Sequence, residues 1–429
     1  MTATEAHRTV NAVWRMESAK VIGALARLTR DVGIAEELAQ DALVAALEQW
    51  PSEGIPDNPA AWLMATAKHR ALDHLRRRQL HAAKEGEISR EIDAQHAMRS
   101  AELAERLDEA LDDDVGDDVL RLVFTACHPV LAPEARVALT LRMLGGLTTD
   151  EIARSFLVTE PTIAQRIVRA KRALASARVP FEAPRAHELP ERLVSVLEVV
   201  YLIFNEGYAA TAGADWMRPA LCDEALRLGR ILAGLMPRSP EVHGLLGLME
   251  IQASRAAARV DQDGEPVLLL AQNRARWDRV LIHRGLESLA RAEQLGGAQG
   301  PYALQAAIAA CHARAATAEA TDWPRIARLY ATLAEVTPSP VVELNRAVAE
   351  TMAFGPAAGL TRVDALRDEP ALKDYHLLPS VRGDFLARLG RTQEAAEEFK
   401  RAAELTRNER ERRLLLARAL HCATRSPTP

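Results

Sequence analysis

The chain has 429 residues, of which 48% are hydrophobic, 26% charged and only 4% aromatic, a composition typical of a soluble, mainly helical protein. Its net charge of −5 excludes a globally basic nucleic-acid coat, so any DNA contact must come from local basic faces. The four cysteines form no CxxC pair, which argues against a zinc site or a disulfide framework and favours a reducing cytoplasm. We expect no signal peptide and no membrane span, because no apolar run approaches about 20 residues.

Residues 35–50 predict an amphipathic helix. Its apolar stripe consists of Leu38, Ala42, Ala45 and Ala46. The residues expected on its polar side are Glu36, Glu37, Gln40, Asp41, Glu48 and Gln49. A loop with three prolines and one glycine is predicted at residues 51–59. Asn58 is placed to cap the next helix, with Pro59 at its first position.

Residues 59–78 predict a helix with a basic end. One face carries Leu63, Ala67, Ala71 and Leu75. The other faces carry Thr66, Lys68, His69, Arg70, Asp73, Arg76 and Arg77. Trp62 lies in the first turn, and an aromatic ring beside cations suits an unstacked base and its phosphates. The alternative is a core tryptophan and a solvated helix end, because arginine at a helix C-terminus also complements the macrodipole.

A polar, acid-rich segment at residues 79–118 predicts a solvated linker with a fraying helix around residues 94–111. Pro133 then begins a helix that ends at Gly145 and Gly146. The residues of this helix expected to support the following helices from behind are Val137, Leu141 and Leu144. Cys127 and His128 are adjacent but have no further ligand residues nearby in the sequence, so both are expected in or near the core.

Residues 148–174 predict two helices joined by a short turn. Thr148 and Glu151 have capping-box spacing, Thr159 is placed to cap the second helix, and Pro161 lies in its first turn. The apolar stripe of the second helix is Ile163, Ile167, Ala170 and Leu174. Its opposite face carries Thr162, Gln165, Arg166, Arg169 and Arg172. Such a helix can lie in a DNA major groove, which predicts a helix-turn-helix; the alternative is a solvated basic face on an ordinary helix pair.

Beyond Pro180, Pro184 and Pro190, which mark a boundary, the pattern is one helix after another. Proline-containing stretches at 237–240 and 338–340 fit a tetratricopeptide-like register of about 34 residues. In that register one repeat ends with Ala225, Gly229, Leu232 and Pro237, and the next begins with Leu246 and Gly247. The clearest unit contains Gly383, Leu386, Ala395, Phe399 and Ala402, with Arg407 where proline is usual. Such units are expected to stack into a solenoid.

Two stretches break this repeat, at residues 201–215 and 261–278. They indicate either a regulatory or partner-facing surface or simple loop packing between repeats. Glu206, Asp261 and Asp263 match no metal loop or acid–base template, so we predict no catalytic residue, no metal site and no cofactor.

Two of these motifs together resemble the extracytoplasmic-function (ECF) RNA polymerase sigma factors, in the subgroup with a long tetratricopeptide-like C-terminal extension. The family's second region carries an "aWL…iarN…D.lRrr" helix, and this chain has AWLMATAKHRALDHLRRR at 61–78, with His69 where the family often has asparagine. The preceding EELAQDAL resembles the family's "DAEDLvQE.f" helix, which docks on the polymerase clamp. The helix-turn-helix of the family's fourth region corresponds to 147–174, and the resemblance covers roughly residues 10–178.

The resemblance implies an all-α fold in four parts: sigma region 2 at 10–80, an acidic linker at 81–117, sigma region 4 at 118–180 and a tetratricopeptide-like extension at 190–425. The residues implied to contact the −10 promoter element are Trp62, His69, Arg70, Arg76, Arg77 and Arg78. Those implied to contact the −35 element are Thr162, Gln165, Arg166, Arg169 and Arg172. Those implied to bind core polymerase are Glu37, Gln40 and Asp41.

The expected partners are therefore core RNA polymerase, through its clamp, and promoter DNA, with a regulatory protein on the C-terminal solenoid and a cytoplasmic location. The resemblance also implies that the acidic linker threads through polymerase channels that otherwise hold nucleic acid. A second hypothesis is a stand-alone helix-turn-helix regulator with a ligand- or protein-sensing helical-repeat domain. An enzyme in the C-terminal half is disfavoured, because the sequence has no P-loop, HExxH, GxSxG or paired-carboxylate template.

Overall fold

The computed structural model describes residues 3–85 and 115–424, and it confirms the predicted all-α fold. The described residues form eighteen α-helices and two strands of two residues each. Contacts divide the chain into two compact units, Met1–Val200 and Tyr201–Pro429. The fraying helix predicted around residues 94–111 lies outside the described residues, as does most of the acidic linker predicted at 81–117.

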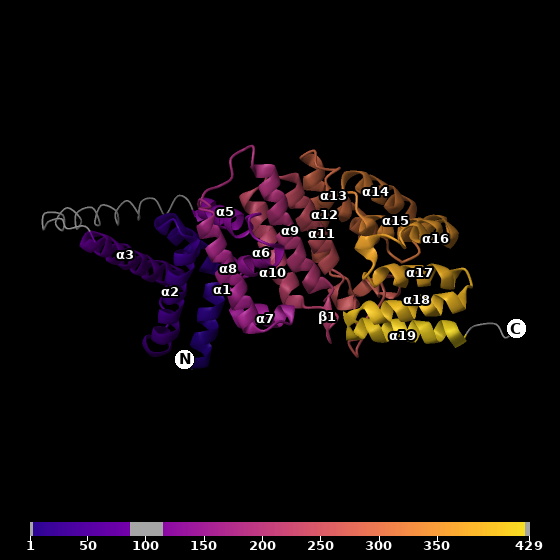
Figure 1. The fold of residues 1–429 in the computed structure, drawn as a ribbon, viewed down its shortest axis with the longest axis horizontal. Helices are drawn as coiled ribbons and strands as arrows, with labels where there is room; N and C mark the ends of the chain where they lie inside the picture. The colour runs from indigo at the N-terminus through magenta and orange to yellow at the C-terminus, as the bar shows by residue number, and fades with distance from the viewer. Residues whose placement is uncertain (1–2, 86–114, 425–429) are drawn as a thin grey trace. The chain divides into compact units, whose positions relative to one another are not determined.

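The first unit begins with three helices that pack on one another, α1 (Ala3–Thr29), α2 (Val32–Glu53) and α3 (Pro59–Glu85) (Figure 1). The Asp31 carboxylate caps α2 by accepting from the backbone N–H groups of Gly33 and Ile34. The four residues of the predicted apolar stripe are all buried. The loop predicted to begin at Pro51 begins instead at Gly54, because a proline in the last turn removes only one helical hydrogen bond.

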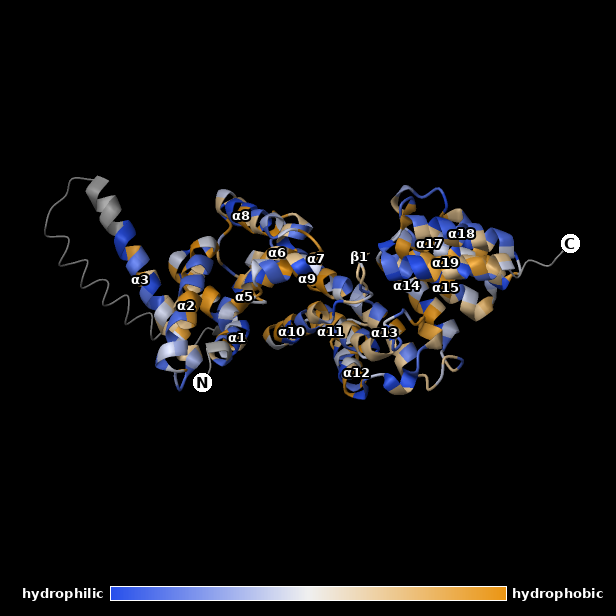
Figure 2. Cartoon of the chain, turned by 90° about the horizontal axis from the view of Figure 1, so that it is seen from below, coloured by the Kyte–Doolittle hydropathy of each residue, from blue (hydrophilic) through white to orange (hydrophobic). Residues whose placement is uncertain are grey.

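Helix α3 begins as predicted, since the Asn58 side-chain oxygen accepts from the Ala61 N–H at 3.1 Å. Its first three stripe residues, Leu63, Ala67 and Ala71, are fully buried. Most of the length of α3 that Figure 2 colours is hydrophilic, which leaves a long polar surface beyond the packed first turns.

The helix-turn-helix consists of α7 (Thr149–Phe156) and α8 (Glu160–Ser176), and both helices pack on α6 (Pro133–Met143). Helix α6 also contacts α5 (Val115–Ala126). The predicted capping box is present: Thr148 Oγ1 accepts from the Glu151 N–H at 3.1 Å, and Glu151 Oε2 accepts from the Thr148 N–H at 2.9 Å. The turn bends through Leu157 at φ 51°. All four stripe residues of α8 are buried.

One predicted cap is wrong. Thr159 occupies the N-cap position of α8, but its hydroxyl lies 2.8 Å from the Thr162 hydroxyl and bonds no backbone N–H. A threonine three residues away offers a competing partner, so the hydroxyl is satisfied side chain to side chain.

The start of α9 (Leu189–Tyr208) completes the first unit. Ser195 Oγ donates to the Cys127 carbonyl at 2.6 Å, and Arg136 Nη1 donates to Ser195 Oγ at 2.6 Å. Burial raises the pKa of Cys127 to about 11, and burial together with the nearby Arg192 guanidinium lowers the pKa of His128 to about 4. Both residues therefore lie in or near the core, as predicted.

The second unit is a series of helices, each packed against the next along the chain. They are α10 (Pro219–Leu235), α11 (Pro240–Ala253), α12 (Arg279–Gln294), α13 (Pro301–Arg314), α14 (Trp323–Val336), α15 (Pro340–Phe354), α16 (Pro356–Ala365), α17 (Leu377–Arg388), α18 (Thr392–Leu405) and α19 (Glu409–Thr424). The short parallel strands β1 (Ala212–Gly213) and β2 (Arg407–Asn408) pair with each other. The connections contain four 3₁₀ turns, η1 (Ala256–Ala258), η2 (Leu269–Ala271), η3 (Arg274–Arg276) and η4 (Pro370–Leu372).

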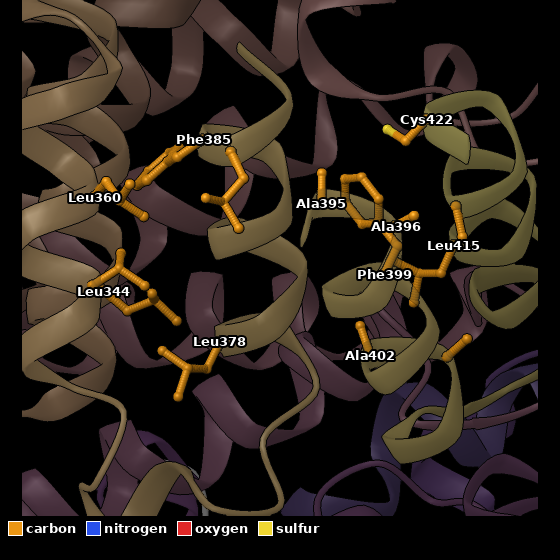
Figure 3. Packing of buried hydrophobic residues seen from close by; sticks show 14 of the residues in the cluster. Leu344, Leu360, Leu378, Phe385, Ala395, Ala396, Phe399, Ala402, Leu415 and Cys422 are labelled. Carbon is orange, nitrogen blue, oxygen red and sulfur yellow. The ribbon is translucent and has the colours of Figure 1, made fainter. Parts of the chain in front are cut away.

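The last helices share an apolar core in which Phe399 of α18 is fully buried (Figure 3). A Cβ placed on Gly383 of α17 would lie 3.0–3.2 Å from atoms of the Phe399 ring. The missing side chain therefore lets α17 approach the aromatic ring. All five residues of the clearest predicted repeat unit are buried in this region, while the assignment to the tetratricopeptide type stays a prediction. Among the residues that the structure describes, no helix combines the length and apolarity needed to cross a membrane.

Candidate nucleic-acid interface

Trp62 lies at the junction between α3 and the end of α2. Its ring meets the buried Trp50 ring edge-on, with centroids 5.5 Å apart and planes at 73°. Trp62 is only partly buried, so one side of the ring packs and the rest remains accessible. The edge-on contact supports the core interpretation for one side of the ring, and the base-stacking interpretation stays a prediction.

The basic end of α3 is open to solvent. His69, Arg76, Arg77 and Arg78 are exposed, and Arg70 is partly buried. Arg76 Nη1 lies 3.6 Å from Asp73 Oδ1, but both side chains are more than half exposed, at 55% and 57%. An exposed pair of this kind contributes only about 0–1 kcal/mol, so a DNA phosphate can replace the aspartate at little cost.

A second cationic face lies on α8, opposite its buried stripe. Gln165, Arg169 and Arg172 are exposed, whereas Thr162 and Arg166 are partly buried. Within the described residues none of the three arginines on this face makes an ion pair or hydrogen bond. Their spacing places them along one side of the helix, so the structure brings together the five residues that the sequence proposed.

The two cationic helices belong to modules that touch. Glu36 of α2 accepts from Arg142 Nε at 2.9 Å, and its other oxygen lies 2.6 Å from Lys171 Nζ of α8. Arg15 of α1 forms an ion pair with Glu151 of α7. Sequence reasoning placed Glu36 on the polar side of its helix, and this was wrong: the residue is only 4% exposed, because cations of the second module cover it.

The residues predicted to bind core polymerase lie beside this contact. Glu37 and Asp41 are exposed, and Gln40 is partly buried. Glu37 also lies 3.4 Å from Lys171 Nζ. A cavity of about 310 Å³ adjoins the contact and is lined by residues that include Arg30, Lys171 and Arg178, so the two modules leave open space between them.

Three segments of the sequence match described protein families. Residues 14–81 match Sigma-70 region 2, residues 121–174 match Sigma-70 region 4, and residues 192–293 match a family of unknown function, DUF6596. The ECF RNA polymerase sigma factor SigK of Mycobacterium ulcerans is 30% identical over 159 residues, which are 36% of this chain and 78% of that protein. The chain belongs to the ECF RNA polymerase sigma factors.

Two further relatives differ in how much of this sigma factor they match. The probable ECF RNA polymerase sigma factor SigI of Mycobacterium tuberculosis is 27% identical over 187 residues, 43% of this chain and 61% of that protein. An uncharacterised protein of Rhizobium meliloti is 42% identical over 409 residues, 95% of each chain, and thus has a similar C-terminal half. The protein is an RNA polymerase sigma factor with a C-terminal extension, whose sigma domains imply core RNA polymerase and promoter DNA as partners. Sigma factors are non-enzymatic initiation factors and act by binding.

In the extension of this sigma factor, the two stretches that break the repeat meet at the start of α19. Arg410 Nε donates to the Ala214 carbonyl at 2.8 Å, and Arg410 Nη1 donates to the Asp263 carbonyl at 3.2 Å. Asp261 Oδ1 accepts from the backbone of its own turn, and Glu206 forms an ion pair with Arg218. These carboxylates therefore hold loops in place, which favours the loop-packing interpretation for them.

Proposed function

We propose that α3 contacts the −10 promoter element through its exposed basic end. The residues assigned to this contact are Trp62, His69, Arg70, Arg76, Arg77 and Arg78. The half-accessible Trp62 ring offers a stacking surface for an unpaired base, and stacking of this kind is worth about 1–3 kcal/mol per base. The exposed arginines beyond it suit the flanking phosphates.

The second DNA contact assigned here is that of α8 with the −35 element. The residues are Thr162, Gln165, Arg166, Arg169 and Arg172. A major groove about 12 Å wide admits an α-helix, and an arginine bidentate to guanine discriminates by about 1–3 kcal/mol. The observation that carries the proposal is that the arginines of this face have no protein partner in the described residues, so their donors are available to bases and phosphates.

The polymerase contact is assigned to Glu37, Gln40 and Asp41 on α2, of which the two carboxylates are exposed. The domain assignment is region 2 at 10–80, linker at 81–117, region 4 at 118–180 and extension at 190–425. We assign the extension a regulatory role, through a protein that binds its tetratricopeptide-like helices. We assign the chain to the cytoplasm, where polymerase and promoter are found.

The decisive experiment is in vitro transcription with purified core polymerase and a cognate promoter. Full-length protein should start RNA chains that core alone does not start, and a version ending at Val200, where the first unit ends, reports the effect of the extension. A gel shift without core provides the matched control. Strong, specific duplex binding without core and no effect on transcription would instead identify a stand-alone regulator.

A further inference from the structure

Five arginines in the described residues are buried, and they fall into two groups. Arg136 pairs with Glu198 at 3.0 Å, and Arg382 pairs with Asp364 and Glu398, each at 2.7 Å. The other three have no carboxylate within ion-pair distance among the described residues, and each is only 7–8% exposed. We call Arg255, Arg259 and Arg274 the buried arginine cluster. A buried charge without a counter-charge is costly, so these three require an explanation that the other two do not.

The first two members of the cluster share one aromatic ring. The guanidinium carbon of Arg259 lies 3.5 Å from the centroid of the Tyr208 ring, and that of Arg255 lies 5.7 Å from the same centroid. Arg259 also lies 5.7 Å from the Trp216 ring. The two guanidiniums are therefore neighbours, held by aromatic faces and not by anions.

The third member joins through Trp277, whose ring centroid lies 5.9 Å from the Arg255 guanidinium and 4.9 Å from that of Arg274. Arg274 donates to the carbonyls of His312 and Ala315, each at 2.7 Å, and to Thr321 Oγ1 at 2.9 Å, and the charge of Glu319 partly offsets the lowering of its pKa by burial. The charges of the cluster also affect a neighbouring histidine. Burial and the positive charges of Arg255 and Arg274 together lower the pKa of His312 to about 3.

Several donors of the cluster lack acceptors. Arg255 Nε, Arg259 Nη1 and Arg274 Nε are buried without a hydrogen-bond partner in the part of the chain that the structure describes. The same holds for Nε1 of Trp277, which lies between two of these arginines. Unsatisfied buried donors on neighbouring side chains point to an acceptor that the protein itself does not supply.

The cluster belongs to the long connection between α11 and α12, part of which packs in the core shared by α11, α12 and α13. All three arginines lie between the end of α11 at Ala253 and the N-cap of α12 at Asp278. Connections longer than about 12–15 residues are uncommon in compact domains and are usually functional. This one is held in place, since Asp278 N donates to the Ser254 carbonyl at 2.8 Å and Val267 N donates to the Arg259 carbonyl at 2.8 Å.

We propose that the buried arginine cluster binds a small multivalent oxyanion, a molecule that carries phosphate or multiple carboxylate groups. Guanidinium forks match the geometry of both groups, and three forks in one place select a ligand with more than one negative charge. The Tyr208 and Trp277 rings orient the forks. This site is independent of the DNA-binding assignments above, and its occupancy is measured without polymerase.

The binding test uses full-length protein and two probes, inorganic pyrophosphate and citrate, which distinguish a phosphate ligand from a carboxylate ligand. At a hundredfold excess over Kd, a bound probe should raise the melting temperature by about 5 °C relative to potassium chloride of matched ionic strength. Isothermal titration calorimetry should give one site per chain. The proposal is overturned if neither probe stabilises the protein more than the chloride control.

Variants locate the site. Arg255→Met keeps most of the side-chain volume and removes the charge, so the melting temperature without probe should stay unchanged or rise. The apparent affinity for the probe should fall at least tenfold, and the probe-induced rise in melting temperature should shrink accordingly. The control is Arg279→Gln, an exposed arginine just beyond the same connection, which should bind the probes like the wild type. Equal binding by Arg255→Met and wild type would overturn the assignment.

A footprint on the unaltered protein covers the case in which Arg255→Met fails to fold. Hydrogen–deuterium exchange, read by mass spectrometry, should show that the better-binding probe slows exchange of the backbone amides in residues 254–278, while the amides of α18 exchange equally with and without it. Absence of protection at the cluster would contradict the proposal.

Discussion

Lys171 Nζ lies 2.6 Å from Glu36 Oε2, and this contact joins α8, proposed to read the −35 element, to α2, proposed to bind the polymerase. The numbering of the two promoter elements separates them by about 25 base pairs, or about 85 Å of duplex. Helix α2 has 22 residues and is only about 33 Å long. The Glu36–Lys171 contact keeps α8 beside α2, so we infer that this closed arrangement of the two sigma modules opens when the protein spans both promoter elements.

Breaking this contact should free the helix-turn-helix, whose DNA-reading face is already exposed, to move away from α2. Glu36→Gln leaves Arg142 and Lys171 without their shared counter-charge, and removing one partner of a buried ion pair typically costs about 3–5 kcal/mol. We expect promoter-duplex affinity without core polymerase to rise about tenfold or more, measured by fluorescence anisotropy. Asp150→Asn, which breaks the exposed Asp150–Arg154 pair, is the control and should change affinity less than twofold. Equal affinities for wild type and Glu36→Gln would contradict the closed arrangement.

Loss of a base-reading arginine should affect promoters but not polymerase binding. Arg169→Ala on the exposed face of α8 is expected to reduce transcription from a cognate promoter by about 10-fold or more, equivalent to about 1–3 kcal/mol. Core binding in a pull-down should remain unchanged. The matched control is Arg154→Ala on α7, whose side chain is 70% exposed and pairs with Asp150. Parallel loss of transcription and core binding in Arg169→Ala would argue against a role in DNA reading.

The buried His312 should make the extension sensitive to acid. Its pKa of about 3 lies below the value of about 6.5 in an unfolded chain, so between these values the unfolded state binds the extra proton. The stability that depends on the neutral ring is complete above pH 6.5 and declines as the pH falls, by about 2 kcal/mol between pH 6.5 and 5.

His312→Gln should remove most of that decline in urea unfolding curves followed by tryptophan fluorescence. His283→Gln changes an exposed histidine on α12 and should keep the wild-type pH dependence. If His312→Gln and wild type lose stability in parallel between pH 6.5 and 5, the burial of a neutral His312 is not what sets the response.

The contact between Gly383 and Phe399 should depend on side-chain size. Gly383→Ala places a methyl group 3.0–3.2 Å from the ring and should destabilise the extension by about 1–3 kcal/mol. Phe399→Leu in the same chain should recover part of that loss, since a smaller side chain makes room for the methyl group. Gly234→Ala in α10 is the matched control, because open space surrounds that position, and it should stabilise by up to about 1 kcal/mol. Additive effects at 383 and 399 would exclude the steric explanation.

The sequence was sufficient where the determining interactions are local. The buried stripe of α8 follows from helical periodicity, and the Thr148–Glu151 capping box follows from a three-residue spacing. Neither needs knowledge of distant segments. The five residues assigned to the −35 contact lie together for the same reason, because one helix orders them.

Interactions between distant segments could not be read in this way. Glu36 is buried by Arg142 and Lys171, more than a hundred residues away, and nothing in the spacing of α2 indicates it. Arginine is rarely buried, so a sequence pattern places Arg255, Arg259 and Arg274 on the surface. The stretch 261–278 was recognised as a break in the repeat, but its convergence with residues 201–215 at Arg410 depends on the packed fold.

The two carboxylate oxygens of Glu151 have separate partners. Oε2 accepts from the Thr148 N–H and secures the first turn of α7, while Oε1 meets Arg15 across the module boundary. Releasing Arg15 therefore leaves the capping box complete. We therefore expect the first turn of α7 to stay folded, and the recognition surface to stay ordered, if the helix-turn-helix moves away from α1 to reach DNA.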